Sequence, residues 1–346
     1  MLDLVKATPI RELLRAELAR KIAFSIGAAE KQVTEIPGLT LTRRTRPMAP
    51  GSGTYEPSLA VVAQGRKRVD LGRTSFLFDE SRFLLTSLDL PIIGQVIEAS
   101  EQAPFLCLML RLEMPVVREL LSREEIPQAP SESPAMAIGE TTPELLSACC
   151  RLMDLLRNPQ DIPFLSRLIQ REIIYRILRG PEGARLRAIA TPGDQSQRTA
   201  KAIAWLRANY SKPLRVEGLA QIAGMGVSTL HHHFRALTAM SPLQYQKQLR
   251  LQAARGRMLM DGVDAASAAF EVGYEKRQPI QPRIQPFLRA TTDAGYSDAA
   301  LAWGSANGIR QQRMRPLPQL HSDDGCGLGT IADTDRNKTK QNDYHN

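Results

Sequence analysis

The sequence predicts an α+β protein: a small β-barrel or sandwich with helices, followed by an all-α part. Three observations support this fold class. Between Ile36 and about Leu112, short apolar runs alternate with Gly, Pro and Asp clusters, which is typical of several short strands. Leucine and isoleucine then recur at helical spacing. Residues 179–197, rich in turn-forming and polar residues, precede a succession of predicted helices and indicate a linker.

Length and composition narrow the function classes. The 346 residues suit two or three domains, and 43% hydrophobic with 23% charged residues is ordinary for a soluble protein with a core. The net charge of +9 favours a polyanionic partner. No signal peptide and no membrane-length apolar run is recognisable, so we expect a cytoplasmic protein without a membrane partner. Four cysteines lack metal-type spacing, and we expect free thiols: Cys107, Cys149, Cys150 and Cys326.

The N-terminal part is expected to begin with an amphipathic helix over residues 8–23. The predicted strands are 39–43, 58–64, 68–72, 82–87, 92–98 and 105–112. The predicted helices that follow are 115–121, 144–156 and 164–178. The apolar stripe of the last helix fits a core position or a dimer face, and both readings stay open.

The all-α part contains a helix-turn-helix pattern. Predicted helices cover 198–210 and 216–223, a glycine-containing turn follows at 224–226, and Val227 opens another helix with a hydroxyl expected at its N-cap. Leu230 and Phe234 would face inward, so the second helix presents polar residues outward. These outward residues are Ser228, Thr229, His231, His232 and Arg235.

Those side-chain types suit double-stranded DNA. Hydroxyls and imidazoles can exchange hydrogen bonds with base edges, and Arg235 can neutralise a phosphate. Residues 198–275 carry ten Lys and Arg against five Asp and Glu, a balance of +5. A metal site at His231–His233 is the rival interpretation. Consecutive helical residues point ~100° apart, so these three cannot chelate one ion, and we expect no metal and no cofactor.

Further motifs resemble a known family. The segment from Ser241 to Tyr245 and the run from Leu249 to Arg255 are similar to the linker helix of AraC/XylS-type transcription regulators. Residues 263–275 resemble the first helix and turn of that family's second helix-turn-helix unit, and residues 55–67 and 86–91 resemble the N-terminal domain of one subgroup.

The resemblance covers roughly residues 10–275 and implies a cupin-like sensor or dimerisation domain, two helix-turn-helix units and a promoter-binding role. It places base reading in the first unit on Ser228, His231 and His232. We therefore expect an N-terminal domain at 1–182, a linker at 183–197 and a DNA-binding domain at 198–275. Implied partners are promoter DNA, RNA polymerase, a small-molecule effector and a second copy of the chain. Activation and repression both stay open, with activation as the expectation.

The chain departs from the family after Glu275. Prolines at 279, 282 and 286 exclude an α-helix where the second recognition helix should begin. Deleting one base at the Glu275/Lys276 junction lets degenerate codons encode S-A-S-Q-F-N-R-E-Y-S-R-F-F-G-Q-P-P, which resembles the family's helix and closing segment. We therefore expect residues 276–346 to be an out-of-frame, disordered tail that leaves the second unit incomplete and impairs promoter binding. A natural, divergent tail is the alternative.

A small-molecule-binding or dimerisation protein with vestigial DNA binding is the alternative to a regulator. An enzyme is not expected, because the first 230 residues contain no histidine and no nucleophile–base pair is recognisable. Asp79, Glu80 and Asp89 are interpreted as turn and surface acids, and we assign no catalytic residue. Arg66 and Arg68 fit either an anionic ligand or ordinary exposed strand positions.

Overall fold

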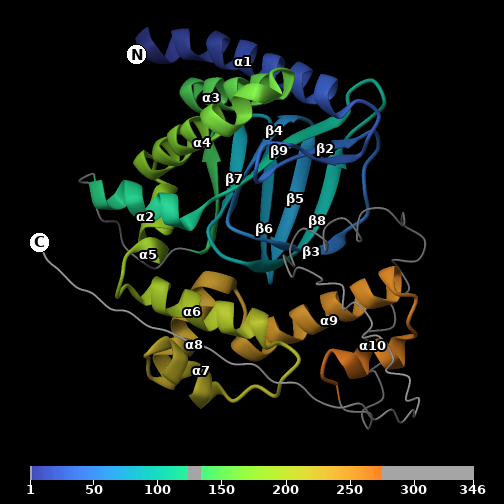
Figure 1. The fold of residues 1–346 in the computed structure, drawn as a ribbon, viewed down its shortest axis with the longest axis vertical. Coiled ribbons are helices and arrows are strands. Elements are labelled where there is room, and N and C mark those ends of the chain that lie inside the picture. Colours follow the sequence, from blue (N-terminus) through green and yellow to red (C-terminus); the bar gives the residue numbers. More distant parts are fainter. Residues whose placement is uncertain (1, 124–133, 275–346) are drawn as a thin grey trace, which may run out of the picture. The chain divides into compact units, whose positions relative to one another are not determined.

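The structure, a computed structural model, describes residues 2–123 and 134–274 (Figure 1). It confirms the mixed α+β class, because a region of β-sheet and helices precedes an all-helical region. Residues 276–346, for which a shifted reading frame is expected, lie outside the described part of the chain. Within that part, no helix is both long enough and apolar enough to cross a membrane.

The strands form two antiparallel sheets. The larger sheet has the order β1-β2-β9-β4-β7-β10, and the smaller has the order β3-β8-β5-β6. Their bounds are β1 (Lys31–Val33), β2 (Leu39–Arg44), β3 (Gly51–Tyr55), β4 (Ser58–Gln64), β5 (Arg66–Leu71), β6 (Thr74–Asp79), β7 (Arg82–Thr86), β8 (Leu90–Glu98), β9 (Phe105–Arg111) and β10 (Met136–Glu140).

Strand β4 is almost continuously apolar, with the sequence SLAVVAQ. Leu59 and Val61 lie in a cluster with the helices, whereas Ala60 and Val62 lie in a second cluster with the smaller sheet. Successive side chains of a strand point to opposite faces. The larger sheet is therefore buried on both faces at β4, which removes the need for polar residues at alternate positions of this strand.

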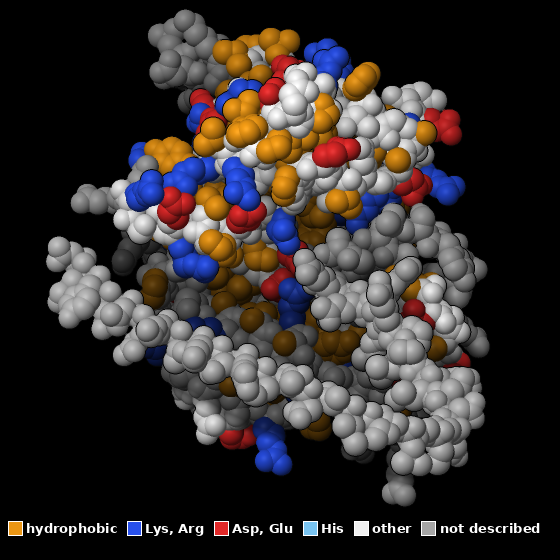
Figure 2. Space-filling view, in the orientation of Figure 1, with side chains coloured by type: hydrophobic (Ala, Val, Ile, Leu, Met, Phe, Trp, Pro, Cys, Tyr) orange, Lys and Arg blue, Asp and Glu red, His pale blue; other side chains and the backbone are white. Residues whose placement is uncertain are grey.

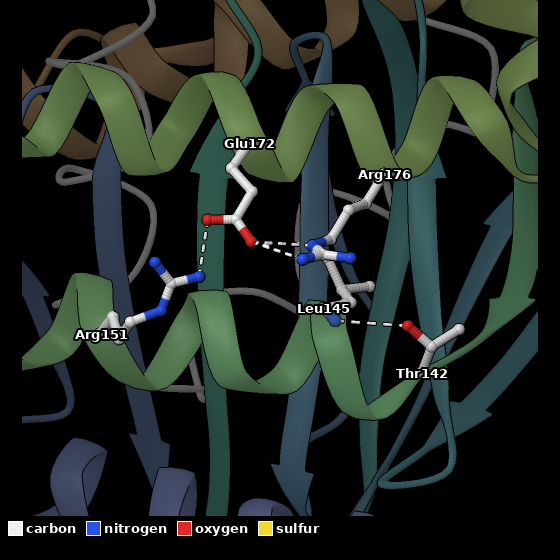
Figure 3. Close-up of polar contacts among 5 residues, drawn as sticks. All are labelled: Thr142, Leu145, Arg151, Glu172 and Arg176. Carbon is white, nitrogen blue, oxygen red and sulfur yellow. Dashed lines mark hydrogen bonds and ion pairs between the residues drawn. The ribbon is translucent and has the colours of Figure 1, made fainter.

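Helices cover the outer face of the larger sheet. They are α1 (Leu2–Ile26), α2 (Met114–Arg123), α3 (Pro143–Asp154) and α4 (Ile162–Arg179). The Thr142 hydroxyl accepts a hydrogen bond from the Leu145 amide at 3.2 Å and caps α3. Glu172 of α4 accepts hydrogen bonds from Arg151 of α3 at 2.6 Å and from Arg176 at 2.7 Å, so one carboxylate ties the two helices (Figure 3).

The all-helical region consists of α5 (Gly183–Ala190), α6 (Gln195–Ala208), α7 (Val216–Ala223), α8 (Val227–Thr238), α9 (Pro242–Met260) and α10 (Ala265–Glu271). Helix α5 lies within the segment expected to be only a linker. Leu186 is fully buried there, and Gly183 approaches α4 so closely that a Cβ would lie 2.3 Å from the Ile177 carbonyl oxygen. Turn-forming residues and arginines surround the short apolar stripe of α5 in the sequence. The segment was therefore predicted to be a linker and not a helix.

Candidate nucleic-acid interface

The turn between α7 and α8 is built on glycines. Gly224 ends α7 in the left-handed region, at φ 64° and ψ 40°, which glycine adopts without steric cost. Gly226 occupies the N-cap of α8, and no side chain caps this end. The expectation of a hydroxyl N-cap at Val227–Thr229 is therefore wrong. The reason is that the helix begins one residue before the first hydroxyl.

The inner face of α8 fixes its orientation. Leu230 and Phe234 are fully buried, and Leu237 is 4% exposed. The Phe234 ring packs edge-to-face against Tyr245 of α9, with ring centroids 5.5 Å apart. These residues share one apolar cluster with the inner residues of α6 and α7.

The outer face of α8 brings the predicted site residues together. All five are exposed: Ser228, Thr229, His231, His232 and Arg235. At 100° per residue, positions 228, 231, 232 and 235 lie on one side of the helix, and Thr229 lies beside them. The rings of His232 and His233 are edge-to-face at 5.3 Å. The described residues contain no group of three or more potential metal ligands.

A cation lies next to this face at the glycine turn. Arg198 of α6 donates a hydrogen bond to the Gly224 carbonyl at 3.3 Å, which holds its guanidinium beside the start of α8. The only acidic residue from 198 to 260 is Glu217. The first helix-turn-helix unit therefore offers a polyanion a positive surface with little opposing charge.

Helices α9 and α10 form where the sequence predicts a linker helix and the first helix of a second unit. Ser241 and Gln244 make a capping box at the start of α9. Asp264 caps α10 by accepting hydrogen bonds from the amides of Ala266 at 2.9 Å and Ser267 at 3.1 Å. The expected position of the second recognition helix falls outside the described residues.

Sequence reasoning missed the contacts between α6, α9 and the N-terminal strands. Asp89 forms an ion pair with Arg207 of α6, and its carbonyl accepts a hydrogen bond from the buried Tyr245 hydroxyl at 2.5 Å. Glu56 lies 3.7 Å from Arg207. Burial alone would lower the pKa of Arg207, but these carboxylates outweigh it and raise the pKa above its ordinary value. Asp89 is therefore more than a surface acid, whereas Asp79 accepts hydrogen bonds from Ser81 within a turn.

The N-terminal domain holds a polar cluster in which Lys67 and Tyr55 are half-buried and Cys107 is buried. The Lys67 ammonium of β5 lies 5.6 Å from the centroid of the Tyr55 ring, and Lys67 is a charged neighbour of Cys107. Burial raises the pKa of the Cys107 thiol to about 11, and Lys67 offsets this only in part. Cys107, Cys149 and Cys150 are free and buried, as expected. Cys326 lies outside the described residues.

Comparisons with known proteins follow the same division of the chain. Residues 35–185 match the family described as AraC-type transcriptional regulator N-terminus, and residues 219–280 match a family described as helix-turn-helix domain. The HTH-type transcriptional activator RhaS of Pectobacterium atrosepticum is 30% identical over 82 residues, which are 24% of this chain and 29% of that protein. The putative HTH-type transcriptional regulator YneL of Escherichia coli is 56% identical over 36 residues, 10% of this chain and 61% of that protein.

The chain thus spans less than two thirds of the length of either relative. Among solved structures, ToxT from Vibrio cholerae O395 is 8% identical, with 81% of this chain and 99% of that chain covered and a TM-score of 0.47. ToxT from Vibrio cholerae strain SCE256 with a bound unsaturated fatty acid is also 8% identical, with 78% and 98% covered and a TM-score of 0.47. The two family matches show that an AraC-type N-terminal domain precedes a helix-turn-helix domain in this chain.

Proposed function

We propose that this chain is a cytoplasmic transcription activator that binds double-stranded promoter DNA through its first helix-turn-helix unit, with RNA polymerase as its further partner. The observation that carries this proposal is the exposed polar row of α8, held outward by the buried Leu230 and Phe234. A helix with this division of faces can enter the major groove while its apolar side stays in the core.

Each exposed residue of α8 has a proposed role. Ser228, His231 and His232 read base edges, because hydroxyls and neutral imidazoles both donate and accept hydrogen bonds. Thr229 and Arg235 contact phosphates and fix the helix in the groove. The recognised sequence is therefore set by three side chains, and the affinity is set largely by the surrounding positive charge.

Selection from a randomised duplex library tests this assignment. We expect the full chain to enrich a motif and the double variant His231→Ala/His232→Ala to lose part of it, since a good base contact contributes about 1–3 kcal/mol. Arg118→Ala, an exposed substitution on α2, is the matched control and should enrich the parental motif. Enrichment of an identical motif by the double variant would contradict base reading by α8.

The incomplete second unit is part of the proposal. The free energy of specific protein–DNA binding exceeds that of non-specific binding by ~4–10 kcal/mol. Loss of one of the two base-reading helices would remove a large part of this difference. The support is the sequence after Glu275, where prolines interrupt the expected helix and a one-base deletion restores the family pattern. Resequencing the codons for Gly273 to Pro279 tests the reading frame. Binding assays that compare this chain with the one-base-corrected chain test the impairment, and equal affinities would contradict it.

As a second function, we propose that the N-terminal domain, a cupin-like barrel, binds a small-molecule effector. Lys67 supports this, because its side chain lies on the same side of β5 as the buried Val69 and Leu71, and its amine lies beside Tyr55 and near Cys107. Within the described residues no carboxylate pairs with this amine. The amine is in contact with Tyr55, and a ligand with an anionic group would add the ionic partner that the described carboxylates do not supply.

Thermal unfolding of the full chain with a panel of small aliphatic carboxylates and aldehydes tests the effector proposal. A hit that raises the Tm of the parent and of Lys67→Arg, but not of Lys67→Met, would support it. Stabilisation of Lys67→Met to the same extent would place the ligand elsewhere.

We also propose that a second copy of the chain binds the helical layer. Figure 2 shows hydrophobic side chains gathered over the helices at the top of the view. On α4, Phe164 is 77% and Leu168 61% exposed, and on α1 Leu13 is 71% exposed. Sedimentation of Phe164→Asp/Leu168→Asp tests this interface, and the double variant should be monomeric at concentrations where the parent is a dimer.

A further inference from the structure

A cavity of about 440 Å³ lies beside the C-terminal end of α8. Arg73, from the turn between β5 and β6, lines it together with Arg235 of α8. Gln244 and Gln248 of α9 complete its polar lining. The cavity thus collects two guanidinium groups and two amides, and the described residues that line it include no carboxylate.

Both arginines of this cavity are exposed and available. No described carboxylate lies within ion-pair distance of Arg73 or Arg235, unlike Arg207. The Gln244 side-chain oxygen already accepts the Ser241 amide at 2.9 Å, so its NH₂ group is the part left to donate. Two guanidinium groups with no carboxylate among the described lining residues favour an anion with several oxygens, such as a phosphate group.

The turn that carries Arg73 is held against α8 by close packing. A Cβ at Gly72 would lie 2.8 Å from the Ala239 carbonyl oxygen, so only glycine permits this approach. Gly72 also has φ +59°, which disfavours a side chain in any case. Nearby, the Ala135 amide donates to the Leu237 carbonyl at 3.0 Å. The N-terminal domain is therefore in direct contact with the end of α8, and the turn that carries Arg73 is held at the cavity that Arg235 also lines.

The position of Arg235 connects this cavity to the DNA-facing side of α8. Arg235 belongs to the exposed row that includes Ser228, His231 and His232, and it is the member in the last turn. The major groove is ≈12 Å wide and bordered by phosphates, so a helix of this length that reads bases has its end residues over the backbone. The cavity therefore begins where the base-reading row ends and the phosphates should pass.

We propose that this cavity binds a phosphate of the DNA backbone and that Arg73, a residue of the N-terminal domain, is one of the groups that hold it. The proposal rests on the proposed DNA-binding function and deepens it, because it makes the AraC-type N-terminal domain a direct DNA contact. Binding of DNA then depends on the contact between Gly72 and Ala239, since that contact positions Arg73.

The salt dependence of binding tests this proposal, because each phosphate contact adds about 0.9 to the slope of log affinity against log salt. The probe is a fluorescent duplex of random sequence, and the protein is the full chain. We expect Arg73→Ala to lower the slope by about 0.9 and to leave the selected motif unchanged. Arg73→Lys should retain the slope, and Arg118→Ala is the exposed control that should not alter it.

A second variant separates the effect of the position of Arg73 from the effect of its charge. Gly72→Ala keeps Arg73 but pushes the turn away from Ala239, so its slope should fall like that of Arg73→Ala. Circular dichroism must show parental folding for each variant. An unchanged slope for Arg73→Ala in a folded protein overturns the proposal.

Other outcomes distinguish failure of this proposal from failure of the proposed DNA-binding function. A lower slope for Arg235→Ala with a parental slope for Arg73→Ala would leave DNA binding in place and overturn only the role of Arg73. Failure of the unsubstituted chain to bind any duplex would overturn both proposals. Titration with inorganic phosphate at constant ionic strength tests whether the cavity binds a free phosphate compound instead of a phosphate of the DNA backbone. Stabilisation that requires Arg73, combined with a parental DNA slope for Arg73→Ala, would assign the cavity to a small phosphate compound instead of DNA.

Discussion

The first helix-turn-helix unit and the described part of the second differ in how each helix is stabilised. Helix α8 has no side-chain cap, yet Leu230, Phe234 and Leu237 bury its inner face. Helix α10 is capped by Asp264, but its apolar cluster is small. In the first unit the core orients the reading helix, so that local capping is dispensable. In α10 the cap carries a larger share of the local stability.

The largest effect is expected from removing the aromatic ring that anchors the first unit. Phe234→Ala should lower the free energy of unfolding by about 3–5 kcal/mol, because it leaves a cavity against Tyr245. Phe270→Ala is the matched substitution in α10, where the side chain is 56% exposed, and it should cost less than about 1 kcal/mol. Urea denaturation followed by circular dichroism measures both. Equal losses would show that the two units are packed alike.

The contrast between these units also shows what the sequence could predict. The helix-turn-helix was predictable because helical spacing, the glycine turn and the outward polar row all occur within 23 consecutive residues, 216–238. Strand β4 was predicted with its observed bounds, since its apolar run is unbroken. Strand β3 was missed because its Gly51 and Gly53 carry no strand signal, and its pairing with β8 is a long-range property.

Contacts between distant segments were equally hidden. Asp89 has a turn-like sequence environment, and nothing local indicates that Arg207, 118 positions later, is its partner. The proximity of Arg73 to Arg235 depends in the same way on the tertiary fold. The residues proposed to read bases could be predicted from helical periodicity. The contact between the N-terminal domain and α8 depends on tertiary packing alone, so the sequence did not reveal it.

A smaller loss of stability is expected when the ion pairs between α6 and the N-terminal domain are removed. Arg207→Ala leaves the half-buried Asp89 and Glu56 without their cation, and we expect a loss of about 1–2 kcal/mol, less than for a fully buried pair. A double-mutant cycle with Asp89→Ala isolates the pair, and a positive coupling energy is expected. Additive losses would mean that Tyr245 and the apolar packing, and not the ion pair, hold the first unit against the N-terminal domain.

The smallest effect concerns the cap of α10. The Ser267 hydroxyl and the amides of Ser267 and Ala266 hold the pKa of Asp264 below its usual value near 3.8. A depressed pKa means that the cap stabilises the helix above about pH 4 and is lost as pH falls through the lower, folded-state pKa. Asp264→Ala should therefore speed amide exchange at Ala266 and Ser267 near neutral pH, and the difference from the parent should vanish in acid.

Asp264→Asn is the matched control for the charge of this cap, since it keeps an acceptor oxygen but cannot titrate. Its exchange rates should lie near those of the parent at neutral pH and should show no acid transition of this kind. Global unfolding should change little in either variant, because α10 is a short helix at the edge of a small cluster. If Asp264→Ala instead lowered the stability of the whole all-helical region, α10 would have to be coupled to the first unit through α9, and the two units would fold as one.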